Sequence, residues 1–233
     1  MASVTLCRYT KLMFSIESLR GVTPPMQPRL ATGVPGLDAV LGGGLRLGQL
    51  AELSGAVGAG KSSLALSIGL RCLSLGQSVA WIESDPALWP LPSLEAGLPL
   101  DQLLLIRVPP QERLRALQLL LISPGAAAVA VVDLSGALPG REIVAHQLVK
   151  LHRLAERSAT LVLFLTERPP QATSLGLLID VRLHLKVPPQ TGAQDVFART
   201  LDIQILRHKQ GPSQGSFSEV VHGPDRLRLR STL

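Results

Sequence analysis

The sequence predicts an α/β fold with a doubly wound, mostly parallel sheet and antiparallel strands towards its C-terminal end. Short apolar runs alternate with helix-like patterns between residues 49 and 166, an order typical of parallel sheets that are covered on both faces. After residue 170, strand-like runs follow one another with Pro and Gly between them and no long helix, which favours an antiparallel flank. Apolar residues make up 46% of the 233 residues, which is enough for one buried core.

The first 29 residues are predicted to precede this domain as a separate segment. Apolar side chains recur at intervals of three and four between Leu6 and Leu19, so residues 1–21 should form an amphipathic helix. The prolines of residues 22–29 favour an extended linker, and residues 30–233 then form one domain. The apolar face of the helix either folds back onto that domain or docks on another molecule, and the pattern fits both.

Within the domain, each expected strand is a short apolar run and each expected helix has apolar positions at helical spacing. The parallel strands are expected at residues 50–54, 78–83, 103–108, 127–133 and 160–166. The helices between them are expected at residues 61–75, 111–122 and 141–157. The antiparallel flank should contain the runs at residues 178–187, 198–206, 216–221 and 226–229.

Composition excludes several classes of protein. Lys and Arg number 23 against 17 acidic residues, a net charge of +6, which favours polyanionic partners. The two cysteines, Cys7 and Cys72, lie far apart without a CxxC motif, which excludes a disulfide scaffold and a zinc ribbon. The long uncharged runs are broken by Pro and Gly, and the first residues do not resemble a secretory signal. We therefore expect a cytoplasmic protein without a membrane span.

A glycine-rich loop between an expected strand and an expected helix carries the strongest functional signal. It fits the pattern GxxxxGK[ST], in which main-chain N–H groups and the helix N-terminus surround phosphate groups. Lys61 should reach the β- and γ-phosphates and Ser62 should bind Mg²⁺, so the loop predicts binding of ATP or ADP. The expected nucleotide-binding residues are Gly55, Ala56, Val57, Gly58, Ala59, Gly60, Lys61, Ser62 and Ser63.

Acidic residues end two of the expected strands. Asp133 follows a fully apolar run and is expected to hold Mg²⁺ together with Ser62. Glu83 and Asp85 follow another strand, at the end where open α/β sheets bind their ligands, and one of them is a candidate for orienting a water molecule. An exposed acidic turn before Pro86 is the alternative interpretation of the same two residues.

The chain resembles the RecA-like branch of the P-loop ATPases. The resemblance is carried by ATGVPGLD at residues 31–38, by the glycines at 42–44 and by the phosphate loop, and it extends over about residues 30 to 210. It implies a RecA-like core. At the family's water-activating glutamate this chain has Asp85, which is one methylene shorter, and at the family's γ-phosphate-sensing glutamine it has Glu167. Because the negative charge of Glu167 would repel the γ-phosphate, the resemblance implies weak or absent ATP hydrolysis.

DNA binding by this chain is expected to be weak. The loops that hold single-stranded DNA in recombinases correspond to residues 134–140 and 168–176, and both are short. Aromatic residues make up 3% of the chain, which leaves little scope for a base-stacking platform, so any DNA contact should be directed to phosphates. Arg207 and Lys209 match the recombinase lysines that reach a neighbouring subunit's nucleotide, and a solvated strand end is the alternative.

Within the RecA-like branch the chain is similar to the ImuA family, accessory proteins of bacterial damage-induced mutagenesis. The similarity rests on the small size, on the opening at residues 31–44 and on the altered site. It implies a role in the SOS response and translesion synthesis beside ImuB and an error-prone replicative polymerase, with contact to RecA at the nucleoid. An active DNA-dependent ATPase or recombinase and a SulA-like inhibitor of cell division are the alternatives.

Overall fold

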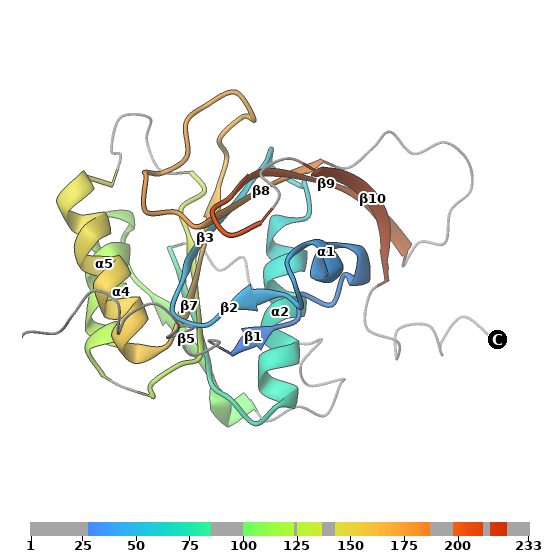
Figure 1. Ribbon diagram of the computed structural model, residues 1–233. Helices are drawn as coiled ribbons and strands as arrows, with labels where there is room; N and C mark the ends of the chain where they lie inside the picture. Colours follow the sequence, from blue (N-terminus) through green and yellow to red (C-terminus); the bar gives the residue numbers. More distant parts are fainter. Residues whose placement is uncertain are drawn as a thin grey trace, which may run out of the picture.

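The computed structural model describes residues 28–84, 100–123, 125–136, 143–186, 198–211 and 215–222 (Figure 1). Within these residues the main sheet has eight strands. In spatial order they are β10 (Gly215–His222), β9 (Ala198–His208), β8 (Val181–Lys186), β3 (Leu50–Ser54), β7 (Leu161–Thr166), β6 (Val129–Asp133), β4 (Val79–Glu83) and β5 (Leu103–Arg107). A small second sheet pairs β1 (Arg29–Leu30) with β2 (Leu45–Arg46).

Neighbouring strands from β5 to β8 run parallel, whereas β9 is antiparallel to β8 and β10 is antiparallel to β9. This arrangement confirms the predicted fold class. In the register of the parallel strands, Ser54 pairs with Thr166 and Asp133 pairs with Leu165. The last residues of β3, β7 and β6 therefore lie together at one edge of the sheet, which we call the carboxyl edge.

Helices cover both faces of the sheet. Figure 1 shows α2 (Lys61–Ser74) on one side and the neighbouring helices α4 (Arg113–Ile122) and α5 (Ala145–Ser158) on the other. The short helix α1 (Pro35–Val40) and two 3₁₀ turns, η2 (Leu100–Gln102) and η3 (Pro110–Glu112), complete the regular structure of the described residues. None of the described helices is both long enough and apolar enough to cross a membrane.

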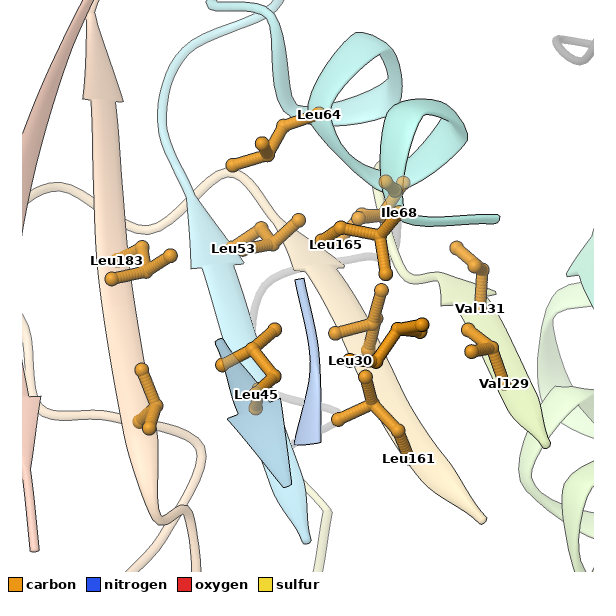
Figure 2. Close-up of a cluster of buried hydrophobic side chains, with 14 of the residues drawn as sticks. Leu30, Leu45, Leu53, Leu64, Ile68, Val129, Val131, Leu161, Leu165 and Leu183 are labelled. Carbon is orange, nitrogen blue, oxygen red and sulfur yellow. The ribbon is translucent and has the colours of Figure 1, made fainter. Parts of the chain in front are cut away.

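The larger core lies between the sheet and α2. Alternate residues of β3 and β7, such as Leu53 and Leu165, point towards Leu64 and Ile68 of α2 (Figure 2). These side chains are all fully buried, and burial of a leucine side chain contributes about 1.5–3 kcal/mol. Because the next residue in each strand faces the opposite side, Phe164 belongs to the second core, under α4 and α5.

The element boundaries differ from the predicted ones by a few residues. Pro110 begins a 3₁₀ turn, so α4 starts at Arg113 and not at residue 111. The strand expected from residue 178 starts at Val181, because the segment before it turns, with the amide of Ile179 bound to Gly176 O at 3.3 Å. Strands β1 and β2 and helix α1 were not predicted, since two-residue strands and a six-residue helix are too short to produce a periodic pattern.

Some predictions fall on parts of the chain that are not described. They concern the helix at residues 1–21, residues 22–27 of the linker, Asp85 and the strand at residues 226–229. Arg29, at the end of the expected linker, lies in β1 opposite Arg46.

Candidate nucleotide-binding site

Glycines shape the loop between β3 and α2. A Cβ atom on Gly55 would lie 2.5 Å from the carbonyl oxygen of Leu185, so the loop passes β8 too closely for any side chain. Gly60 is the N-cap of α2 with a φ of 89°, in the left-handed region that glycine adopts without strain. No side chain caps the N-terminus of α2. Its first N–H groups are therefore suited to bind an anion.

Lys61 folds back over this loop. Its Nζ donates hydrogen bonds to Gly55 O at 2.8 Å and to Ala56 O at 2.7 Å, and the residue is 6% exposed. Burial lowers the pKa of Lys61, whereas the negative charges of Glu167 and Asp133 raise it. The ammonium group thus lies inside the loop and within the influence of two carboxylates.

The remaining polar groups of the predicted site lie at the same carboxyl edge. Ser62 and Ser63 are exposed on the first turn of α2, and Val57 in the loop is 82% exposed. Asp133 ends β6, and its Oδ1 accepts a hydrogen bond from the amide of Ser135 at 2.8 Å. The structure therefore brings Lys61, Ser62 and Asp133 to one edge of the sheet.

These groups fit a nucleotide that carries Mg²⁺. Main-chain N–H groups and an ammonium are donors for phosphate oxygens, and a hydroxyl and a carboxylate are oxygen ligands of the kind that Mg²⁺ takes. Among the described residues no three His, Cys, Asp or Glu side chains gather into a group that could hold a metal ion. Mg²⁺ at phosphate sites is typically bound by one or two protein ligands together with phosphate oxygens and water, a number that Ser62 and Asp133 could supply.

Comparison with known proteins shows the family of this chain. The sequence profile of the RecA N-terminal domain matches residues 19–162, a range that includes the loop, α2 and the strands ending at Glu83 and Asp133. The chain belongs to the RecA family.

Its relatives include RecA proteins of several bacteria. Protein RecA of Thioalkalivibrio sulfidiphilus (strain HL-EbGR7) is 28% identical over 236 residues, which cover 86% of this chain and 68% of the relative. Protein RecA of Legionella pneumophila (strain Corby) is 30% identical over 214 residues, which cover 78% of this chain and 62% of the relative. The chain thus spans about two thirds of the length of these RecA proteins.

A solved structure supports the fold. The crystal structure of the RadB recombinase matches with a TM-score of 0.66 and 22% sequence identity, over 81% of this chain and 94% of that one. At this identity the match shows a shared RecA-like core. It carries no information about what this chain binds.

Two expected catalytic carboxylates have different surroundings in this RecA-family chain. Glu83 is fully buried, and its Oε1 accepts a hydrogen bond from Arg107 Nε at 3.1 Å. Glu167 follows β7, is exposed, and acts electrostatically on Lys61. Of the two, Glu167 is therefore the carboxylate associated with the phosphate loop, whereas Glu83 pairs with the neighbouring strand β5.

Arg207 and Lys209 lie at the opposite edge of the sheet. Because β9 is antiparallel to β8, its last residue His208 pairs with Val181, which in turn pairs with Ala51 near the start of β3. From Ala51 the strand needs about 13 Å to reach the phosphate loop. Neither cation is thus beside the loop of its own chain.

Both cations bind acceptors of the segment that precedes β8. Lys209 Nζ donates to Asp180 Oδ1 at 2.9 Å. Arg207 Nη2 donates to Leu177 O at 2.8 Å. These contacts hold the two side chains in place at the edge away from the phosphate loop.

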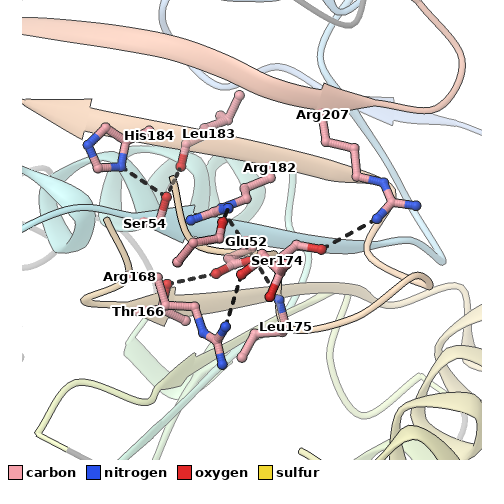
Figure 3. Close-up of polar contacts among 12 residues, drawn as sticks. Glu52, Ser54, Thr166, Arg168, Ser174, Leu175, Arg182, Leu183, His184 and Arg207 are labelled. Carbon is pink, nitrogen blue, oxygen red and sulfur yellow. Dashed lines mark hydrogen bonds and ion pairs between the residues drawn. The ribbon is translucent and has the colours of Figure 1, made fainter. Parts of the chain in front are cut away.

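A buried polar network next to the site was not anticipated (Figure 3). Glu52 of β3 is fully buried, and its Oε1 accepts a hydrogen bond from Thr166 Oγ1 at 2.9 Å. Its Oε2 accepts from the amide of Leu175 at 3.1 Å and lies 3.6 Å from Arg182 Nε. The sequence held a signal for Glu52, a charged residue within the apolar run of β3, whereas Arg182 lies in a strand that alternates apolar and polar residues and does not stand out.

Arg182 ties this network to the connection between β7 and β8. Its Nη1 donates to Ala172 O, and its Nη2 donates to Pro169 O at 2.9 Å. Burial lowers the pKa of Arg182, while the charge of Glu52 raises it. The connection that follows Glu167 is thereby packed against the sheet over residues 169–175.

His184 lies beside the last residue of β3. The hydroxyl of Ser54 donates to Leu183 O at 3.1 Å, so the His184 Nδ1 atom, 3.2 Å from the same hydroxyl oxygen, acts as the donor to it. Burial lowers the pKa of His184, and the charges of Lys186, Arg182 and Lys61 lower it further. The neutral ring is therefore the favoured form next to the loop.

Proposed function

We propose that this RecA-family chain is an ATP-binding accessory protein of bacterial DNA damage tolerance that hydrolyses ATP slowly or not at all. The observation that carries the proposal is the loop at the carboxyl edge, where Lys61 lies inside a glycine turn and no side chain caps α2. ATP or ADP with Mg²⁺ is the proposed ligand, held by Gly55–Ser63, with Mg²⁺ on Ser62 and Asp133. RecA-family proteins in general bind nucleotide with Mg²⁺.

Two substitutions relative to the family pattern support slow hydrolysis. Asp85 replaces the longer glutamate that would activate water, and Glu167 replaces a neutral glutamine. The negative charge of Glu167 raises the pKa of Lys61 against the larger effect of burial. A carboxylate in that position repels the γ-phosphate, and it competes with phosphate for the ammonium group.

We propose that the chain acts on a protein partner, and that DNA is at most a weak, phosphate-directed ligand. The partners are RecA itself and, from the resemblance to the ImuA family, ImuB and an error-prone replicative polymerase, in the cytoplasm near the nucleoid. Arg207 and Lys209 lie away from their own phosphate loop. This placement supports a contact with a neighbouring subunit's nucleotide, and that neighbour would be a RecA subunit or a second copy of this chain.

A working DNA-dependent ATPase is the second candidate, because the chain is 28–30% identical to RecA proteins over 214–236 residues and retains Lys61, Ser62 and Asp133. It predicts phosphate release that single-stranded DNA stimulates and that Lys61→Ala abolishes. The accessory role predicts turnover near background with and without DNA.

The decisive experiment is calorimetry of the 233-residue chain with ATP and with ADP in magnesium buffer, followed by co-purification with RecA in the presence and absence of nucleotide. We expect binding of both nucleotides by the wild type and none by Lys61→Ala. Lys150→Ala is the matched control, because Lys150 is an exposed lysine of α5 bound to Gln118. Absence of heat for a folded wild-type sample would refute nucleotide binding. Equal RecA recovery with and without nucleotide would refute control of the partner by the ligand.

A further inference from the structure

Arg113 is a buried cation that neither the phosphate loop nor the acidic residues of the proposed site account for. It is the first residue of α4 and is 4% exposed. The connection that leads to it is held at the carboxyl edge, because the amide of Val108, one residue beyond β5, binds Glu83 O at 3.1 Å. Arg113 therefore enters the sheet edge where β4 and β6 end.

The guanidinium group of Arg113 connects these two strand ends. Its Nε donates to Ser84 Oγ at 2.6 Å, and its Nη1 donates to Asp133 O at 2.6 Å, with a longer contact to Ser135 O at 3.4 Å. Ser84 directly follows β4, and Asp133 is the last residue of β6. One planar side chain thus fixes the distance between two neighbouring strands beyond their last ladder pair, Ile82 and Val132.

Both the main chain and the side chain of Asp133 are held by hydrogen bonds. Arg113 holds the carbonyl oxygen of Asp133, and the Oδ1 atom accepts from the amide of Ser135 two residues later. The carbonyl oxygen of Ser135 is a third acceptor of the same guanidinium. The turn after β6 and the carboxylate are therefore oriented together by Arg113.

We infer that Arg113 is a positioning residue, which orients Asp133 towards the Mg²⁺ of a bound nucleotide without touching nucleotide or metal itself. The inference rests on the nucleotide binding proposed above. The fork of Nε and Nη1 reaches two strands at once, and the single ammonium of a lysine has no such geometry. Groups that orient metal ligands in this way typically change metal affinity 10- to 100-fold when they are removed.

The test uses the 233-residue chain and the fluorescent probe mant-ATP, titrated first in EDTA and then with increasing Mg²⁺. For Arg113→Lys and Arg113→Gln we expect the Mg²⁺ concentration at half-maximal enhancement of binding to rise about 10-fold, while the affinity measured in EDTA stays within about twofold of the wild type. Arg115→Gln is the control, since Arg115 is on the same helix, carries the same charge and has a side chain that is 75% exposed. We expect the control to behave as the wild type.

Ser84→Ala keeps the test informative if the Arg113 variants fail to fold, because it removes only the hydroxyl that accepts from Nε. It should raise the Mg²⁺ requirement by less than the Arg113 variants do. An unchanged Mg²⁺ requirement in folded variants, or an equal loss of affinity in EDTA and in Mg²⁺, would overturn the positioning role. A wild type that binds no mant-ATP under either condition would instead refute the proposed nucleotide site.

Discussion

At the scale of single residues, Glu52 and Arg182 form a buried ion pair within the sheet. Truncation of Arg182 removes its ion pair with Glu52 and its hydrogen bonds to two main-chain carbonyl oxygens. Leaving Glu52 buried without its counter-charge costs about 3–5 kcal/mol. We expect Arg182→Met to lower the free energy of unfolding in urea by that amount. Arg153→Met, at an exposed position of α5, should change it by less than about 0.5 kcal/mol.

His184 makes stability depend on pH with a definite sign. Its folded-state pKa is lowered by burial and by nearby cations, whereas in the unfolded chain its pKa is about 6.5. As the pH falls below that value the unfolded chain binds protons that the folded chain does not, so the free energy of unfolding decreases. The loss continues until the pH passes the lowered pKa.

Urea unfolding at several pH values between about 8 and 5 checks this dependence. His184→Asn retains a donor for Ser54 and should flatten part of the decline. His208, whose pKa is lowered by burial and by Arg29 and Arg46, should account for a further part. The same slope in the wild type and in His184→Asn would contradict the assignment, and replacement of the exposed His146 is the control.

At the scale of elements, helix α2 contains a buried glycine, Gly69, on the face that packs against the sheet. A Cβ on Gly69 would meet Val79 at 3.5 Å, an ordinary contact. Gly69→Ala should therefore stabilise the protein by about 0.5–1 kcal/mol through helix propensity. Gly44→Ala is the opposite case, because its φ is 113° and a Cβ would lie 2.2 Å from Leu30 O. Thermal unfolding of both variants measures the difference, and a destabilised Gly69→Ala would contradict the packing described for α2.

At the scale of the whole molecule, the nucleotide should act as a stabilising ligand, because the loop that would bind it is formed only when β3 and α2 are folded. A ligand that binds only the folded state at 100 times its Kd adds about 2.7 kcal/mol. We expect ATP with Mg²⁺ to raise the Tm of the wild type and to leave that of Lys61→Ala unchanged. An equal shift in both proteins would mean that the ligand binds elsewhere.

Much of this architecture was predictable from local pattern. The alternation of apolar runs and helix-like segments predicted the parallel sheet, and the spacing of GxxxxGK[ST] placed the loop between β3 and α2, where it lies. The roles of Asp85 and of residues 1–21 stay predictions, since they lie outside the described residues.

The sequence by itself determined most of the helices and strands of the main sheet and the RecA-like family, because side-chain periodicity and a short contiguous motif are local properties of the chain. Only the tertiary structure decided which strand ends meet. Glu52 and Arg182 are 130 positions apart, Arg113 reaches Ser84 and Asp133 from a third element, and Arg207 lies at the far edge from Lys61 because β9 reverses direction. Such contacts depend on strand order and direction, which the repeat of side chains along one strand does not encode.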